Sequence, residues 1–172
     1  SLAEYQNDVS ALSTTPSGLS ITSSFDSAGF SVSSAGDVNG DGWIDMIISA
    51  HFQTGASALA GKSYVIYGGA WLASKQTISL DNVGDTVPGF VISGWEAGEE
   101  SGTSVSSAGD FNGDGLADLL VGAIYSNLGG KFSGATYVVL GKTDNSVVNL
   151  SSLKSNIGGF VIKGENAQDK VG

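Results

Sequence analysis

The sequence predicts an all-β protein made of antiparallel four-stranded units that recur along the chain. The 172 residues include 26 glycines and two prolines, and charged residues make up only 14 %, a composition typical of a chain with many turns. Runs of four to seven apolar and β-branched residues alternate with Gly, Asp, Asn and Ser, and no segment has a sustained 3.6-residue apolar period. A long internal repeat organises these runs.

The repeat is clearest around two acidic loops. Residues 28–45 read AGFSVSSAGDVNGDGWID and residues 101–118 read SGTSVSSAGDFNGDGLAD, with 13 of 18 positions identical at a shift of 73. The same shift places GKSYVIYGG (61–69) on GATYVVLGK (134–142). Because two separate segments match at one offset, the chain contains a tandem repeat of about 73 residues.

A third landmark sets the ends of the repeats. GFVISG (89–94) recurs as GFVIKG (159–164) at a shift of 70, so the second repeat is about three residues shorter. GLSITS, which precedes the first loop, resembles these two segments. The predicted division is a partial preceding repeat with an outer strand (1–28), a first repeat (29–101), a second repeat (102–170) and the start of a third (171–172).

The predicted strands follow one another in the same order in both repeats. SVSSAG precedes the acidic loop, and IDMIISA or ADLLVGA follows it. The next strand signals are SYVIYG or TYVVLG, then TISL or VVNL, and finally FVISG or FVIKG. Residues 70–77 fit this pattern least well and could hold a helical turn.

About four antiparallel strands per tandem repeat predict β-propeller blades, since a solenoid would have a much shorter period. The chain holds about two blades plus partial repeats, which makes an incomplete propeller. Two blades cannot close a ring, so apolar faces would be left uncovered. We therefore expect either the remainder of a larger propeller or self-association. The absence of a starting Met and of a signal peptide favours a processed or excised piece.

The two acidic loops have the spacing of a metal-binding loop. Oxygen-bearing side chains fall at positions 1, 3, 5 and 9, and the glycines between them allow the backbone to curl tightly. Position 7 has no ligand side chain, so its backbone carbonyl is the expected donor. The candidate ligands of the two predicted sites are Asp37, Asn39, Asp41, Trp43 and Asp45 in the first loop, and Asp110, Asn112, Asp114, Leu116 and Asp118 in the second.

Calcium is the ion that this donor set favours, because it takes six to eight oxygen ligands. Magnesium demands a smaller octahedron, and zinc is disfavoured in a chain with no Cys and one His. EF-hands need a carboxylate at position 12, where this chain has Ile48 and Val121. The alternative, that Asp, Asn and Gly only form turns, leaves the same register in both loops unexplained.

The run G-x-S-V-x-x-A-G-D-x-N-G-D-G-x-x-D, followed by apolar residues and Val121-Gly122-Ala123, resembles the FG-GAP repeat. The resemblance implies the blades of integrin α-subunit propellers and of bacterial secreted and surface proteins, with calcium held in a hairpin of the blade by the loop residues named above. It departs from the family pattern at Ala28 and Ser101, which replace the aromatic residue, and at Ser49-Ala50-His51. It implies an extracellular or cell-surface location.

Composition excludes several classes of function. Seven Lys and no Arg stand against 17 Asp plus Glu, and the net charge of −10 disfavours nucleic acids and anionic membranes. No apolar stretch reaches the length of a membrane span. Six of the 17 acids lie in the two loops, which leaves no paired carboxylates for hydrolysis.

The remaining candidates are lone residues or small clusters. His51 is interpreted as structural, and Trp71 and Trp95 as packing residues that could otherwise stack on sugars. Glu96, Glu99 and Glu100 are interpreted as a solvated loop rather than a further cation site.

The function that the sequence favours is a non-enzymatic calcium-binding module for adhesion or for binding a protein partner, with calcium making its loops rigid. A glycan-binding propeller is the alternative, and an accessory part of a hydrolase or lyase is the least favoured reading.

Overall fold

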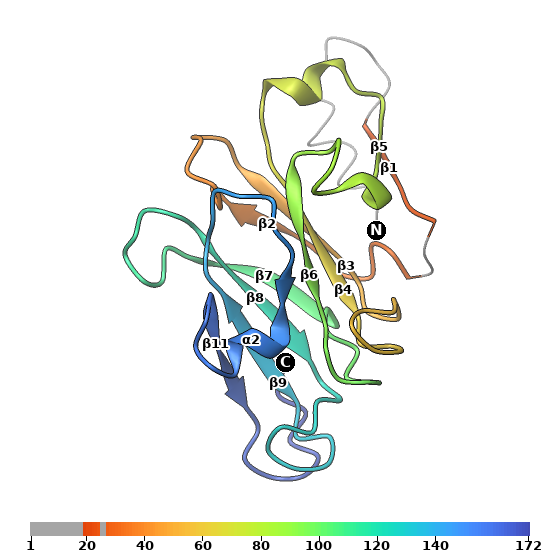
Figure 1. Cartoon of the computed structure of the whole chain (residues 1–172), viewed down its shortest axis with the longest axis vertical. Coiled ribbons are helices and arrows are strands. Elements are labelled where there is room, and N and C mark those ends of the chain that lie inside the picture. The colour runs from red at the N-terminus through yellow and green to blue at the C-terminus, as the bar shows by residue number, and fades with distance from the viewer. Residues whose placement is uncertain (1–18, 25–26) are drawn as a thin grey trace.

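The protein is mostly β, as the sequence predicts (Figure 1). The computed structural model describes residues 19–24 and 27–172, so most of the predicted partial repeat at 1–28 lies outside the described residues. The described strands form two large sheets and one small one, and the helices are short.

The first sheet contains the strands that flank the first acidic loop. Its order is β10-β6-β4-β3-β2, and neighbours from β6 to β2 are antiparallel. Its bounds are β2 (Val32–Gly36), β3 (Asp45–Ala50), β4 (Lys62–Ile66), β6 (Gly89–Ser93) and β10 (Val148–Asn149). The short strand β10 comes from the second repeat and pairs with β6 in parallel. One strand of the second repeat therefore extends the sheet of the first.

The second sheet repeats this arrangement with the order β11-β9-β8-β7, all antiparallel. Its bounds are β7 (Ser104–Gly109), β8 (Asp118–Ala123), β9 (Ala135–Val139) and β11 (Gly159–Lys163). Registers agree between the sheets, since Val32 faces Ile48 and Val105 faces Val121. A bulge precedes the acidic loop in both hairpins, and it bends the strand locally.

A small parallel sheet joins β1 (Ser20–Thr22) to β5 (Thr77–Ser79). The predicted helical turn near 70–77 is confirmed as a 3-10 helix over Ala70–Ser74. A second 3-10 helix, Leu80–Asn82, follows β5, and the α-helix α2 (Leu150–Leu153) follows β10. The TISL and VVNL segments are thus strands, but each pairs with a strand that precedes its own repeat.

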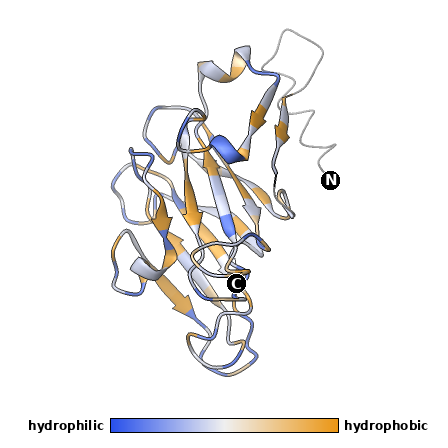
Figure 2. Ribbon diagram, turned by 45° about the vertical axis from the view of Figure 1, so that its right-hand side comes forward, coloured by the Kyte–Doolittle hydropathy of each residue, from blue (hydrophilic) through white to orange (hydrophobic). Residues whose placement is uncertain are grey.

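Two apolar cores lie on opposite faces of the first sheet. Successive side chains of a strand point to opposite faces, so Ile47 of β3 joins the core shared with the second sheet and Ile48 joins the other. The shared core includes Val121 and Tyr137 of the second sheet. Figure 2 shows hydrophobic residues concentrated on the strands. The acidic loops lie at the ends of the strands that these cores fix.

Candidate metal centre

The first loop (37–45) connects β2 to β3 and is folded around the carboxylate of Asp37. Oδ1 of Asp37 accepts the backbone N–H of Gly40 at 2.8 Å and of Asp41 at 3.0 Å. Oδ2 accepts the N–H of Gly42 at 2.9 Å. Gly40 and Gly42 both have positive φ, which L-residues with a side chain rarely adopt. The loop is therefore curled so that its N–H groups point at position 1.

Positions 3 and 5 of the first loop contact each other. The Asn39 amide donates to Oδ2 of Asp41 at 2.9 Å, and its Oδ1 accepts the Asp41 N–H at 3.0 Å. Oδ1 of Asp41 accepts the N–H of Trp43 at 2.9 Å. Three of the predicted ligand positions are thus in one hydrogen-bonded turn.

Position 9 fastens the loop to the sheet. Asp45 is buried, and its carboxylate accepts the N–H of Val38 at 2.8 Å and of Gly68 at 2.7 Å. Burial, and to a lesser extent repulsion from Asp41 and Asp37, raises the pKa of Asp45 to about 6, although the two N–H groups oppose that rise. Asp45 therefore joins the loop to the segment that follows β4.

The second loop (110–118) has the same hydrogen bonds at nearly the same distances. Asp110 accepts the N–H groups of residues 113, 114 and 115 at 2.8, 3.0 and 2.9 Å. Asn112 and Asp114 pair through the Asn112 amide at 2.8 Å, and Asp114 accepts the Leu116 N–H. Asp118 is buried and accepts the N–H of Phe111 and of Gly141. The same sequence motif therefore adopts the same loop conformation in both repeats.

The donor chemistry of both loops fits a hard cation. All the side-chain groups are carboxylate or amide oxygens, and carboxylates crowd within nine residues of each loop. Among residues 19–24 and 27–172, no group of three or more His, Asp or Glu side chains is arranged to hold a metal ion. The ligand assignments, including the carbonyls of Trp43 and Leu116, stay predictions.

The surroundings of the two loops differ. Backbone carbonyls of the first loop accept N–H groups from the second repeat: Ala117 donates to Asp37 O at 2.8 Å, and Lys142 donates to Val38 O at 3.0 Å. A Cβ added at Gly36, just before the loop, would lie 2.6 Å from the Ala117 Cβ, whereas one added at Gly109 would meet nothing within 4 Å. The second repeat thus covers the start of the first loop, residues 37–39, whereas residues 40–44 and the matching start of the second loop are exposed.

Three other residues that the sequence singles out have packing positions. His51 is buried between the rings of Phe30 and Phe52, with centroids 3.9 and 4.0 Å away. The indole N–H of Trp71 donates to Tyr67 O, and that of Trp95 donates to the Tyr137 hydroxyl. Both tryptophans are partly buried against the apolar cores.

The interpretation of residues 96–100 as a solvated loop is wrong for Glu99. Its side chain is fully buried, and its carboxylate accepts from Trp95 N–H at 2.8 Å and the Tyr137 hydroxyl at 2.8 Å. Burial raises the pKa of Glu99. Glu99 therefore connects the end of the first repeat to β9. The one sequence signal that set Glu99 apart was the repeat alignment, which places another acidic residue, Asp169, at its position.

Comparison with known families addresses the second loop directly. The family model for the FG-GAP repeat matches residues 101–139, a segment that contains the whole second loop and strands β7 and β8. The chain carries an FG-GAP repeat. The expected resemblance is thereby confirmed, and the first loop has the same hydrogen bonds as the matched FG-GAP loop.

Curated proteins similar to this chain include two integrin subunits and one enzyme. Integrin alpha-E of Mus musculus is 35 % identical over 101 residues, 55 % of this chain, and Integrin alpha-PS5 of Drosophila melanogaster is 35 % identical over 109 residues, 62 % of this chain. Phosphatidylinositol-glycan-specific phospholipase D of Dictyostelium discoideum is 31 % identical over 147 residues, 79 % of this chain.

The chain spans a small part of each of these relatives. The matches cover 8 %, 15 % and 9 % of integrin alpha-E, the phospholipase D and integrin alpha-PS5. The similarity therefore concerns the repeat module. In the described part of the chain, no helix is long and apolar enough to cross a membrane.

Proposed function

We propose that the chain is a calcium-binding FG-GAP β-propeller module with two calcium sites, one in each acidic loop. Each antiparallel sheet would be one blade, and the chain would form part of a larger propeller. The observation that carries the proposal is the repetition of the Asp37-centred hydrogen bonds around Asp110, because two independent loops adopt one curled conformation.

In the proposed sites, five oxygen donors per loop surround one ion. Asp37, Asn39, Asp41 and Asp45 supply side-chain oxygens and Trp43 its carbonyl, with the equivalent residues in the second loop. Oδ1 of Asp37 accepts two N–H groups, whereas Oδ2 accepts one and keeps a second lone pair that can face an ion. Bound calcium would neutralise the crowded carboxylates and hold the hairpin rigid.

The module would act in adhesion or in binding a protein partner outside the cell or at its surface. Support comes from the integrin relatives, whose similarity covers more than half of this chain. Rigid loops favour binding because less conformational entropy is lost when the partner docks. No catalytic role is proposed, although one relative is named a phospholipase D.

A glycan-binding role has less support. The two tryptophans that suggested it, Trp71 and Trp95, use their indole N–H groups inside the protein and pack against the cores. The adhesion proposal is therefore the one to test.

Isothermal titration of the metal-free chain with calcium tests the two-site proposal. We expect two ions per chain for the wild type, one for Asp41→Ala, one for Asp114→Ala and none for the double variant. Asp85→Ala removes an exposed carboxylate outside the loops and should leave two sites. Wild-type chain that takes up no calcium, or a double variant that still binds two ions, would reject the proposal.

A further inference from the structure

The chain contains two Asn-Gly dipeptides, at residues 39–40 and 112–113, and both lie in the acidic loops. Asparagine is among the thermolabile residues of proteins, and it deamidates most readily before glycine. The reason is steric, because glycine has no Cβ to hinder attack of its backbone nitrogen on the asparagine side chain. Each acidic loop therefore contains the dipeptide on which this covalent modification depends.

Deamidation of an Asn-Gly dipeptide is a ring closure followed by hydrolysis. The glycine nitrogen attacks Cγ of the asparagine, so that the N–Cγ bond forms and the Cγ–Nδ2 bond breaks. The released nitrogen leaves as ammonia, and it carries away the amide proton of the glycine. Water then opens the cyclic imide. Opening at the side-chain carbonyl gives aspartate, and opening at the main-chain carbonyl gives isoaspartate, in which the backbone runs through the side chain and is one methylene longer.

The hydrogen bonds inside the two loops oppose ring closure equally. The backbone N–H of each glycine donates to the Asp at position 1, at 2.8 Å in both loops. The side-chain amide of each asparagine donates to the Asp at position 5, at 2.9 Å in the first loop and 2.8 Å in the second. Ring closure therefore requires a local opening of the loop, and the loops differ in what else must break.

The second repeat holds the first dipeptide in place. The carbonyl of Val38, in the peptide bond before Asn39, accepts the Lys142 N–H at 3.0 Å. A Cβ added at Gly40 would lie 2.8 Å from Cδ2 of Leu116, so this side chain of the second repeat lies against the dipeptide. Asn39 is accordingly only partly exposed.

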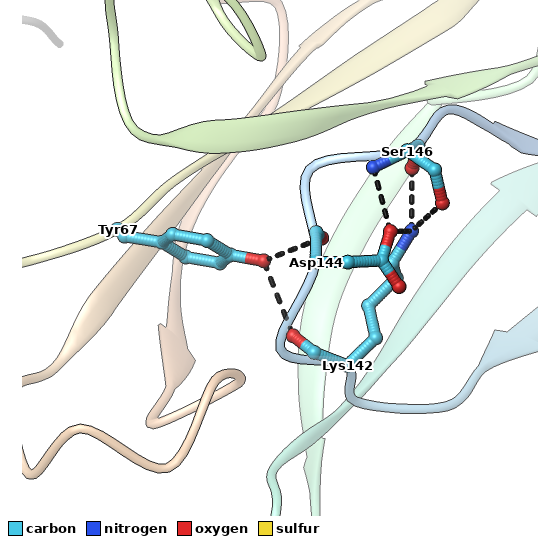
Figure 3. Close-up of polar contacts among 4 residues, drawn as sticks. All are labelled: Tyr67, Lys142, Asp144 and Ser146. Atoms are coloured by element: carbon cyan, nitrogen blue, oxygen red, sulfur yellow. Dashed lines mark hydrogen bonds and ion pairs between the residues drawn. The ribbon is translucent and has the colours of Figure 1, made fainter.

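The segment that covers Asn39 is itself anchored to the first repeat (Figure 3). The Tyr67 hydroxyl, which follows β4, lies between the carbonyls of Lys142 and Asp144, at 3.1 and 3.2 Å. The Lys142 ammonium also pairs with the Asp144 carboxylate at 2.9 Å. Opening of the first loop at Asn39 must therefore separate it from a segment that is held in place.

The second dipeptide lacks these contacts. Asn112 and Gly113 are both exposed. Among residues 19–24 and 27–172, no backbone N–H donates to the carbonyl of Phe111, which precedes Asn112. A Cβ added at Gly113 would meet nothing within 4 Å. Opening of the second loop at this point therefore breaks only the hydrogen bonds of the loop itself.

We infer that Asn112 is a site of spontaneous deamidation and that the second repeat protects Asn39, which has the same sequence after it. In the isoaspartate product, the longer backbone would move the N–H groups of Gly113 and Asp114 away from Asp110. The second loop would then lose its curl, while the first loop keeps its own. Loss of one calcium site would follow if the proposed function holds, whereas the modification itself does not depend on calcium.

Peptide mapping of the full chain, incubated at neutral pH in excess chelator, tests this inference. Electron-transfer fragmentation distinguishes isoaspartate from aspartate and reports the conversion at each asparagine. We expect Asn112 to convert at least about fivefold faster than Asn39, because opening the first loop breaks two further backbone hydrogen bonds. In the urea-unfolded chain, the two residues should convert at equal rates, because both precede the sequence Gly-Asp-Gly.

Three outcomes of this mapping would overturn the inference. Equal rates in the folded chain would show that the second repeat gives no protection. The same ratio of rates in the folded and unfolded chain would assign the difference to sequence alone. An Asn112 that stays intact in the folded chain, over a period in which the unfolded chain converts, would show that the loop does not open.

Two variants of the full chain locate the protection. Leu116→Ala removes the side chain that lies against Gly40 and should speed conversion of Asn39 by at least about twofold, through the lost packing contacts. Leu59→Ala is the control, because this exposed residue lies in the connection from β3 to β4, beyond the other end of β3. Its Asn39 should convert as in the wild type. Equal Asn39 rates in the two variants would also overturn the inference.

Discussion

The two acidic loops share their internal hydrogen bonds and differ in what covers them. In the first loop, the carbonyls of Asp37 and Val38 accept N–H groups from the second repeat, and Val38 is fully buried. In the second loop, Phe111 occupies the position of Val38 and is exposed. The nine-residue motif therefore determines the curl of the loop, and the neighbouring repeat determines how far the first three residues of the loop are shielded from water.

This difference bears on stability more than on metal chemistry. Asp45 and Asp118 are both buried and both accept two backbone N–H groups, so each anchors its loop alike. Only the first loop also contacts the other sheet, through the hydrogen bonds from Ala117 and Lys142. This contact between the first loop and the second repeat is called the joint below. Matched substitutions at equivalent positions should separate the contribution of the motif from that of the joint.

The largest difference is expected at the position of Val38 and Phe111. Val38→Asp should lower the free energy of unfolding by about 3–5 kcal/mol, because it buries an unpaired charge. Phe111→Asp should lower it by about 1 kcal/mol or less, since that residue is exposed and mainly loses its contact with Phe160. Urea unfolding at pH 7 measures both, and equal losses would show that the joint does not shield the first loop.

A smaller difference is expected between Asp45→Ala and Asp118→Ala. Asp45→Ala leaves the N–H groups of Val38 and Gly68 without their acceptor in a covered loop, a loss of about 2–4 kcal/mol. Asp118→Ala should cost less, because water can reach the exposed Phe111 segment. Unfolding in chelator excludes any contribution from metal. If Asp118→Ala lowered the free energy of unfolding more than Asp45→Ala does, the proposed difference in shielding between the two loops would be wrong.

Tyr67 provides a more local test of the joint. Tyr67→Phe removes the hydroxyl placed between the carbonyls of Lys142 and Asp144, and should cost about 1 kcal/mol. The repeat counterpart is Leu140, which has no hydroxyl. Tyr125→Phe is the control, since the Tyr125 hydroxyl makes no hydrogen bond in the described structure, and its unfolding should match the wild type. If both variants unfold alike, the hydroxyl does not stabilise the joint.

Glu99 makes the stability of the other end of the joint depend on pH. Its pKa is raised above 4.5 by burial, so the folded state favours the protonated carboxyl, and stability falls as the pH rises from 4.5 through the folded pKa. Glu99→Gln should remove this fall, so the stability of the variant relative to wild type should increase with pH. Tyr137→Phe removes a donor to the carboxylate, which raises the folded-state pKa of Glu99 further, and should extend the fall to higher pH. Parallel pH profiles for wild type and Glu99→Gln, from urea titrations, would contradict this role.

Much of the fold follows from patterns that the sequence displays. The repeat at a shift of 73 predicted that β2–β3 and β7–β8 would be equivalent hairpins around acidic loops, and their registers agree. Alternation in β3 places Ile47 and Ile48 on opposite faces, which both prove to be buried. The helical turn near residue 70 was also predictable from its poor fit to a strand.

Contacts between the repeats were not predictable from local patterns. The TISL and VVNL segments have the composition of strands. Nothing in these segments indicates that they pair with β1 and β6, which precede their own repeats. Glu99 read as a solvated acid because its burial depends on Tyr137, 38 residues away. The two N–H groups that donate to the first loop belong to residues 117 and 142. These hydrogen bonds use the backbone alone, so the side chains at the two positions do not indicate them.

Thermal unfolding of the wild-type chain in millimolar calcium and in excess chelator tests the central claim most directly. An ion that binds only the folded state stabilises it by about 2.7 kcal/mol per site at one hundred times its Kd. The account predicts a large rise in Tm with calcium, which the Asp41→Ala, Asp114→Ala double variant loses. Equal Tm values for the wild type in both buffers would mean that the loops are turns without a bound ion, and the calcium proposal would be wrong.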